Sequence, residues 1–259
     1  MLPDVIFEWS LGSSFLFMLA VTGAVALALH LIFFLPPVQR MSIRIGDLSP
    51  ILQNLAGTFF ALSVAFLASA VWATEDRAHK IVNDEALSIR RVSTYAQSLS
   101  APSRDTVQNL IRDYAKAVER EWPSMSDSES DMPANRDIAA LYAAVISGLS
   151  ENEQNRMLQQ RLLTAVDAMG QAREHRRLTA AKESVSNGQW IMVSLLAVLL
   201  LVVIAACHGR WPASRAAALV LITFAISIPL FVILAHDRPF AGHQAISPEP
   251  ILAAGGLLR

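Results

Sequence analysis

The stretch that decides the fold is residues 58–101, TFFALSVAFLASAVWATEDRAHKIVNDEALSIRRVSTYAQSLSA, which contains neither glycine nor proline. It is apolar from Phe59 to Trp72, with small residues between the large ones, and charged residues begin at Glu75. A hydrocarbon core is only about 30 Å thick, whereas a helix of this length extends roughly 65 Å. We therefore predict one helix that leaves a bilayer and continues into water, where it couples the membrane to a soluble layer.

The charge along the chain is distributed unevenly. Of 259 residues, 53% are hydrophobic and 17% are charged, against about 25% in a soluble domain. Four stretches are almost free of charge, and nearly all the charge lies between the second and third of them. This predicts an all-α polytopic membrane protein with four transmembrane helices and a helical cytoplasmic region between helices 2 and 3. The expected divisions are helices 1 and 2 at 1–72, the cytoplasmic region at 73–187, helices 3 and 4 at 188–236, and a cytoplasmic C-terminal segment at 237–259.

Several classes of function are excluded by composition and motif. A net charge of −1 argues against nucleic acid as a partner. The one cysteine, Cys207, cannot form an internal disulfide. The sequence contains no nucleophile motif, phosphate loop or dinucleotide fingerprint, so we expect neither an enzyme nor a cofactor.

Proline and hydrophobicity place the transmembrane helices. Pro36 and Pro37 should end the first helix, because a residue before proline is pushed out of the α region, and 38–49 should be a short connection. His30, inside the first helix, should form a hydrogen bond between helices. The expected spans are roughly 10–35, 50–72, 189–207 and 213–235.

The polar region should consist of helices around the extension of the long helix. Pro102 should stop that helix, and Ser103 should cap the next one. Asn187-Gly188 should form a break or a hinge at the membrane surface. Apolar residues at spacings of seven, seven and three predict a buried seam on the extension, formed by Val82, Ile89, Ala96 and Leu99.

Basic residues indicate the orientation. Four spans put both termini on the same side as the polar region. Ten lysines and arginines flank that region or follow the fourth span, whereas the two short loops contain only Arg40, Arg44, Arg210 and Arg215. The positive-inside bias therefore favours a cytoplasmic polar region and cytoplasmic termini.

Several short motifs accompany the spans: 66–72 leading into Asn83-Asp84-Glu85-Ala86, Glu121-Trp122-Pro123, Asp237-Arg238-Pro239-Phe240 with Gly242, and Ser247-Pro248. With the arrangement of the spans, these motifs resemble the small bacterial bestrophin-like membrane proteins, a group largely of unknown function. The resemblance covers roughly residues 50–250. A more distant similarity to bestrophins, which are pentameric anion channels, implies a homo-oligomer, with a pentamer favoured, in the bacterial inner membrane. It also implies a permeant anion and contact with membrane lipid. The sequence has no acidic run after helix 4 like the calcium-binding segment of animal bestrophins.

Helix 2 is the best candidate for lining a pore. Amide and hydroxyl donors and the positive edges of aromatic rings can replace part of an anion's hydration, and no span contains an acidic residue. The competing interpretation is ordinary packing, since small residues let membrane helices approach closely. The candidate lining residues are Asn54, Phe59, Phe60, Ser63 and Phe66.

The segment after helix 4 should form a junction. Pro239 fixes the chain as it leaves the helix, and Phe240 offers a large apolar surface for docking. We expect Phe240 to pack on the helix 2 extension at 72–79, with Asp237 or Arg238 bonded there to backbone or to an opposite charge.

Two alternatives to a channel remain open at this point. The first is a non-conducting membrane adaptor whose cytoplasmic helices bind a partner. The second is a metal-dependent transporter or sensor that uses Asp76, His79, His236 and Asp237. Asp76 and His79 share a helix face at a metal-ligand spacing, although a hydrated rim with ion pairs explains them as well.

Overall fold

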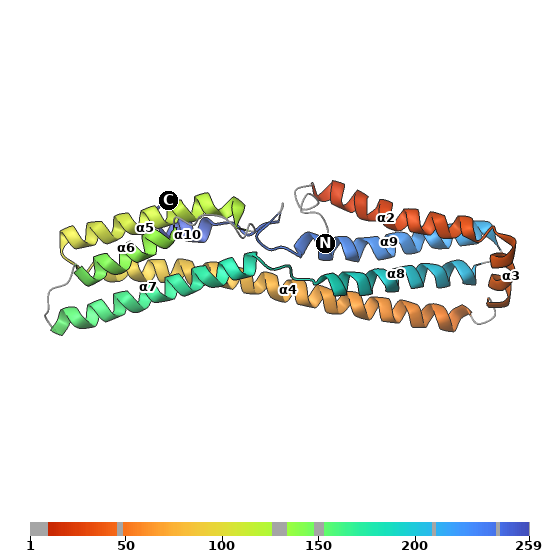
Figure 1. Cartoon of the computed structure of the whole chain (residues 1–259), viewed down its shortest axis with the longest axis horizontal. Coiled ribbons are helices and arrows are strands. Elements are labelled where there is room, and N and C mark those ends of the chain that lie inside the picture. The colour runs from red at the N-terminus through yellow and green to blue at the C-terminus, as the bar shows by residue number, and fades with distance from the viewer. Residues whose placement is uncertain are drawn as a thin grey trace. The chain divides into compact units, whose positions relative to one another are not determined.

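The computed structural model describes residues 10–45, 49–125, 134–147, 153–208, 211–241 and 244–258. Within these residues all regular structure is helical (Figure 1). The chain forms two compact units. The membrane unit comprises Met1–Thr74, Glu183–Arg238 and Gly242–Gln244, and the polar unit comprises Glu75–Lys182, Pro239–Ala241 and Ala245–Arg259.

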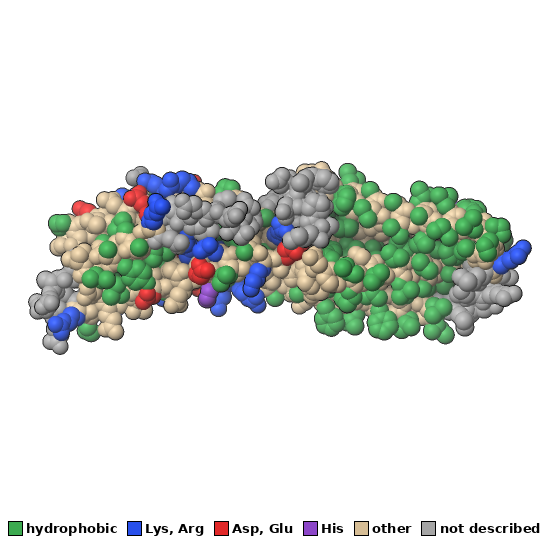
Figure 2. All heavy atoms as spheres, in the orientation of Figure 1, with side chains coloured by type: hydrophobic (Ala, Val, Ile, Leu, Met, Phe, Trp, Pro, Cys, Tyr) green, Lys and Arg blue, Asp and Glu red, His purple; other side chains and the backbone are tan. Residues whose placement is uncertain are grey.

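The membrane unit contains α2 (Leu11–Ile32), α3 (Pro36–Ile45), the first part of α4 (Ser49–Ala96), α8 (Asn187–Cys207) and α9 (Pro212–His236). By length and composition, four of these helices, all but α3, are suited to crossing a membrane. This confirms the prediction of an all-α protein with four transmembrane helices. α9 packs against both α2 and α8. Apolar side chains cover much of this unit's visible surface, as expected for a surface in contact with lipid (Figure 2).

The ends of the transmembrane helices show where sequence signals were misread. α8 begins at Asn187, because Ser186 and Gln189 form a capping box at its N-terminus. The break therefore lies before Asn187-Gly188, and the prediction of a break at these two residues was wrong. Similarly, Pro36 and Pro37 open a further helix, α3, where the sequence suggested a connection. Proline is favoured in the first turn of a helix because the N–H that it lacks has no partner there.

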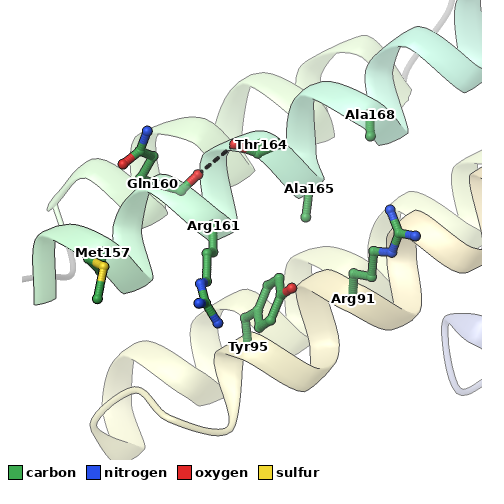
Figure 3. A pocket seen from close by; sticks show the side chains of 8 residues that line it. All are labelled: Arg91, Tyr95, Met157, Gln160, Arg161, Thr164, Ala165 and Ala168. Atoms are coloured by element: carbon green, nitrogen blue, oxygen red, sulfur yellow. Dashed lines mark hydrogen bonds between the residues drawn. The ribbon is translucent and has the colours of Figure 1, made fainter. Parts of the chain in front are cut away.

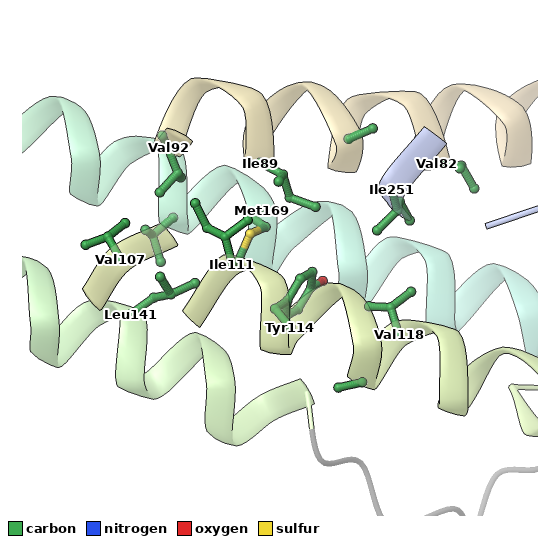
Figure 4. Close-up of a cluster of buried hydrophobic side chains, with 14 of the residues drawn as sticks. Val82, Ile89, Val92, Val107, Ile111, Tyr114, Val118, Leu141, Met169 and Ile251 are labelled. Atoms are coloured by element: carbon green, nitrogen blue, oxygen red, sulfur yellow. The ribbon is translucent and has the colours of Figure 1, made fainter. Parts of the chain in front are cut away.

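The polar unit contains the remainder of α4, α5 (Ala101–Glu121), the 3₁₀ turn Trp122–Ser124, α6 (Ala134–Ser147), α7 (Glu153–Ala180) and α10 (Glu249–Ala254). The seam predicted on the α4 extension is buried and belongs to one apolar cluster with side chains of α5, α6, α7 and α10 (Figure 4). α10 ends against α5 at Gly255, where an added Cβ would lie 2.4 Å from the Cβ of Ala115. Only glycine fits this contact.

α4 is continuous over its 48 residues, and from residue 58 to its end it contains no glycine or proline, as the sequence analysis noted. Its end differs from the prediction. The helix stops at Ala96, and Pro102 lies in the first turn of α5, which begins at Ala101. Pro102 therefore helps to start the next helix, and the residue that flanks α5 is Ser100, not Ser103.

His30 forms a polar contact within the membrane unit, as predicted. The Arg215 Nε donates to His30 Nδ1 at 3.4 Å, linking α9 to α2. The Arg215 guanidinium also lies over the rings of Phe33 and Phe34, at 5.6 Å and 5.1 Å from their centroids. Aromatic faces attract a cation, so they help to hold this buried arginine among the transmembrane helices.

Candidate pore-lining face and junction

The membrane part of α4 has a buried face and an exposed face. Phe60 is only 6% exposed and belongs to the core of the membrane unit, whereas Phe59 and Phe66 are 54% and 66% exposed. The Phe60 ring therefore packs inside the membrane unit. Because its ring is buried, Phe60 is removed from the candidate lining residues.

The remaining lining candidates do not all share one direction. Successive residues of an α-helix are about 100° apart, so Phe59, Ser63 and Phe66 lie on one face. Asn54 precedes Phe59 by five residues and points about 140° away from it. Leu62, which is 50% exposed, belongs with the aromatic side chains and was missed by the sequence analysis. We call Phe59, Leu62, Ser63 and Phe66 the aromatic face.

Two hydroxyl groups on the membrane part of α4 are already used by the helix. Ser63 Oγ donates to the Phe59 carbonyl at 2.8 Å, and Thr58 Oγ1 donates to the Asn54 carbonyl at 2.7 Å. These protons are not directed at a passing ion. An anion at the aromatic face would therefore meet ring edges before it met hydroxyl donors.

The junction begins with a buried carboxylate at the end of α9. The side chain of Asp237 is 1% exposed and accepts a hydrogen bond from the Val185 N–H at 2.7 Å. The Asp237 carbonyl also accepts from Ser184 N–H at 3.1 Å. Burial raises the pKa of the Asp237 carboxyl, while the hydrogen bonds from Val185 and the Trp190 side chain oppose that rise. The next residue, Arg238, donates to Glu183 at 2.6 Å.

Asp237 therefore fixes the segment that leads into α8. Asp237 bonds to backbone groups, as predicted. These groups belong to the segment before α8, whereas the prediction placed them on α4.

The second half of the junction lies in the polar unit, where the chain turns back on itself. Phe240 is buried in the same apolar cluster as Ala78 of α4, and its ring meets Trp122 edge to face at 5.9 Å. Trp122 Nε1 donates to the Ile246 carbonyl at 2.8 Å, and Ile246 N–H donates to the Pro239 carbonyl at 2.8 Å. Phe240 is thus buried with Trp122 as its ring partner, and its direct contact with residues 72–79 stays a prediction.

Beside Trp122, α7 contributes two buried arginines that the sequence analysis used only as topology signals. The Arg176 guanidinium lies 4.9 Å from the centre of the Trp122 ring and forms two hydrogen bonds with Glu85, at 2.7 Å and 3.0 Å. Arg173 pairs with Glu121 at 3.0 Å. Pairing with Glu85 raises the pKa of Arg176 despite the opposing effect of burial.

The short motifs found in the sequence therefore meet in one place. Glu85, Trp122 and Phe240 come from three separate motifs, and Arg176 lies between the first two. Tyr114 completes the cluster by donating to Glu85 at 2.5 Å. Burial first, and then the Glu85 charge, raise the pKa of the Tyr114 hydroxyl well above its ordinary value. The phenol therefore stays protonated and donates. We call these five residues the motif cluster.

The metal alternative gains no support from the described residues. Within them, no three His, Cys, Asp or Glu side chains gather closely enough to hold a metal ion. The Asp237 carboxylate is occupied by the Val185 N–H, and His236 Nδ1 lies 2.9 Å from the Val232 carbonyl. Asp76 and His79 are exposed on α4.

These features define a polytopic helical membrane protein with a buried ionic cluster in its polar unit. The family model for the bestrophin-like domain matches residues 19–251, and the chain belongs to this family. Among curated proteins, no sequence matches it.

Solved structures share the fold at low sequence identity. A variant of a bacterial bestrophin homologue from Klebsiella pneumoniae has a TM-score of 0.68 and 12% identity, over 94% of this chain and 98% of that one. Another structure of the K. pneumoniae homologue gives a TM-score of 0.66 and 12% identity, over 94% and 99%. A variant described only as a membrane protein gives 0.66 and 13%, over 93% and 98%. At such identities the likeness concerns the fold.

Proposed function

We propose that the protein is an oligomeric ion channel, permeable to anions such as chloride, whose pore is lined by the aromatic face of α4. The observation that carries the proposal is the division of neighbouring rings on this helix: Phe60 is buried, while Phe59 and Phe66 are exposed. In the proposed assembly the exposed rings from several protomers surround a common axis. A pentamer in the bacterial inner membrane, with the polar unit and both termini in the cytoplasm, is the favoured arrangement.

Two further features support an anion as the permeant species. The membrane part of α4 contains no acidic residue, so no fixed negative charge lies on the proposed path. Ring edges carry partial positive charge and interact favourably with anions. Phenylalanine rings would also form an apolar constriction that conducts only when it is wetted.

Chloride flux into proteoliposomes tests the proposal. Phe59→Ala and Phe66→Ala should raise the flux by widening the constriction, and Ser63→Glu should suppress it by adding a negative charge. Phe60→Ala is the matched control. It removes the same ring from the buried face, so it should lower the free energy of unfolding by about 3–5 kcal/mol without widening the path.

The outcomes separate the proposal from its alternatives. An adaptor would assemble normally and show no flux in any variant. A cation pore would conduct more after Ser63→Glu, which would overturn the anion assignment. If Phe60→Ala raised chloride flux in folded protein while Phe59→Ala did not, the lining face would be wrongly assigned.

A further inference from the structure

A hollow between α4 and α7 of the polar unit lies outside the proposed pore-lining face and outside the motif cluster. It is a cavity of about 340 Å³, within the size range of small-molecule sites. α4 contributes Arg91 and Tyr95, and α7 contributes Gln160 and Arg161 (Figure 3). A second hollow of about 270 Å³ continues along the same two helices and shares Arg91 with the first.

The lining of the first cavity is basic and unneutralised. It includes two guanidinium groups and no carboxylate. Among the described residues, neither Arg91 nor Arg161 has a carboxylate within ion-pair distance, in contrast to the buried Arg173 and Arg176 of α7, which are both paired. Figure 3 shows Arg161 extending from α7 beside the Tyr95 ring, while Arg91 rises from α4 towards α7. The two positive charges therefore enter the cavity from opposite walls.

The other lining groups suit a polar ligand with an attached organic part. The Gln160 amide can donate, and the half-buried Tyr95 offers both a hydroxyl group and a ring face. Thr164 already donates its hydroxyl proton to the Gln160 carbonyl at 2.8 Å. Ala165 and Ala168 are small, so they add little bulk to the lining.

We propose that this cavity binds a small phosphate-bearing molecule, whose dianionic phosphate lies between Arg91 and Arg161. The planar guanidinium group matches phosphate oxygens in a bidentate geometry, and two such groups balance a dianion. A monocarboxylate would satisfy only one of the two arginines in this way. The Tyr95 ring provides a surface for the remainder of the molecule.

A soluble ligand fits the position better than a lipid headgroup. Arg91 lies 16 residues beyond Glu75, the first α4 residue of the polar unit, which is about 24 Å along the helix axis. The headgroup layer on one side of a bilayer is only about 5–8 Å thick. A phosphate bound at Arg91 is therefore supplied from solution.

Calorimetric titration of the detergent-solubilised full chain with inorganic phosphate tests the site, with ionic strength held constant by acetate. We expect saturable binding of one phosphate per chain. Arg91→Gln and Arg161→Gln should each weaken it roughly tenfold or more, because each removes a charge-assisted pair of hydrogen bonds.

Two arginines outside the cavity, exposed like Arg91 and Arg161, provide matched controls. Arg90 precedes Arg91 on α4, and Arg156 lies on α7 outside the cavity. Arg90→Gln and Arg156→Gln change the net charge equally but should leave phosphate affinity within about twofold, since exposed charges at a distance are screened.

Three outcomes would overturn the proposal. They are the absence of saturable phosphate binding by the wild type, equal weakening by the cavity and control variants, and equal affinity for acetate. The measurement does not depend on conduction, so a protein that binds phosphate but passes no chloride would refute the channel and leave this site intact.

Discussion

At the scale of single residues, the buried ion pairs were the main feature that the sequence analysis missed. Arg173 and Arg176 were counted only as basic residues near the membrane. A usable signal was present, because the apolar face of α7 at Ala165, Val166 and Met169 continues at helical spacing onto both arginines. Charged residues on a buried face need partners, but sequence does not show which acidic residues supply them.

Removing only one partner of the Glu85–Arg176 pair should lower the free energy of unfolding strongly. Arg176→Met would leave the Glu85 carboxylate buried with Tyr114 as its remaining partner, at a cost of about 3–5 kcal/mol in the free energy of unfolding. The neighbouring variant Arg177→Met breaks a solvent-accessible pair with Glu174 and should cost no more than about 1 kcal/mol. Chemical denaturation in detergent measures both, and equal losses would show that burial of the pair contributes nothing.

The Asp237 carboxyl links stability to pH. Its folded-state pKa is raised above the ordinary value of 3.8, chiefly by burial, so the folded protein holds this proton better than the unfolded chain does. Ionisation of Asp237 therefore lowers the free energy of unfolding as the pH rises from about 3.8 through the raised pKa. This group favours the folded state most in acid.

Asp237→Asn should remove that dependence, because the amide resembles the protonated carboxyl and its oxygen still accepts from Val185 N–H. We expect the Tm of this variant, relative to wild type, to rise between acid and neutral pH. Asp237→Ala leaves the Val185 N–H buried without its acceptor and should cost about 1–3 kcal/mol at every pH. A constant difference between Asp237→Asn and wild type across the pH range would contradict the linkage.

At the scale of elements, the presence of each helix was easier to predict than the residues at which it begins and ends. The long helix followed from a stretch without glycine or proline, and its buried seam followed from apolar spacing. The errors at Pro36, Pro102 and Asn187 have a common cause. Proline and glycine near a helix end can close one helix or open the next, and the choice depends on which backbone groups find partners in the folded chain.

The continuity of α4 through Ile89 should be needed for assembly. Proline at position 89 lacks the N–H that closes a helical turn, and its ring clashes with the backbone of the preceding turn. Together these effects lower the free energy of unfolding by about 3 kcal/mol or more. We expect Ile89→Pro to lose the assembled oligomer in native mass spectrometry. Ile89→Val keeps the backbone and costs only about 0.5–1.5 kcal/mol, and Ser88→Ala removes a hydroxyl that donates to the Asp84 carbonyl of its own helix. Both controls should assemble, and normal assembly of Ile89→Pro would show that α4 need not be continuous.

At the scale of the whole molecule, sequence predicted the class, the four spans and the family, because hydropathy and short motifs record them directly. It did not show that the motifs at Glu85, Trp122 and Phe240 meet, since that contact depends on three-dimensional packing of segments more than 30 residues apart. It also placed Phe60 on the wrong face of α4. A run of apolar residues in a membrane helix gives little periodic contrast, so inside and outside faces are hard to separate until the neighbouring helices are known.

The orientation of the chain in the membrane is the last prediction, and it rests on the excess of basic residues beside the polar unit. Two arginines in that count, Arg173 and Arg176, are neutralised by buried partners, and Arg215, counted with the short loops, is buried inside the membrane unit. Eight residues against three remain, which favours the same orientation. In a Cys207→Ala background, single cysteines at the exposed positions Ser98 and Ser247 should resist a membrane-impermeant thiol reagent in intact cells, whereas a cysteine at Ser214 should react. All three should react after the cells are opened, which controls for local shielding. Labelling of Ser98→Cys and Ser247→Cys but not Ser214→Cys in intact cells would invert the topology and place the phosphate-binding cavity outside the cell.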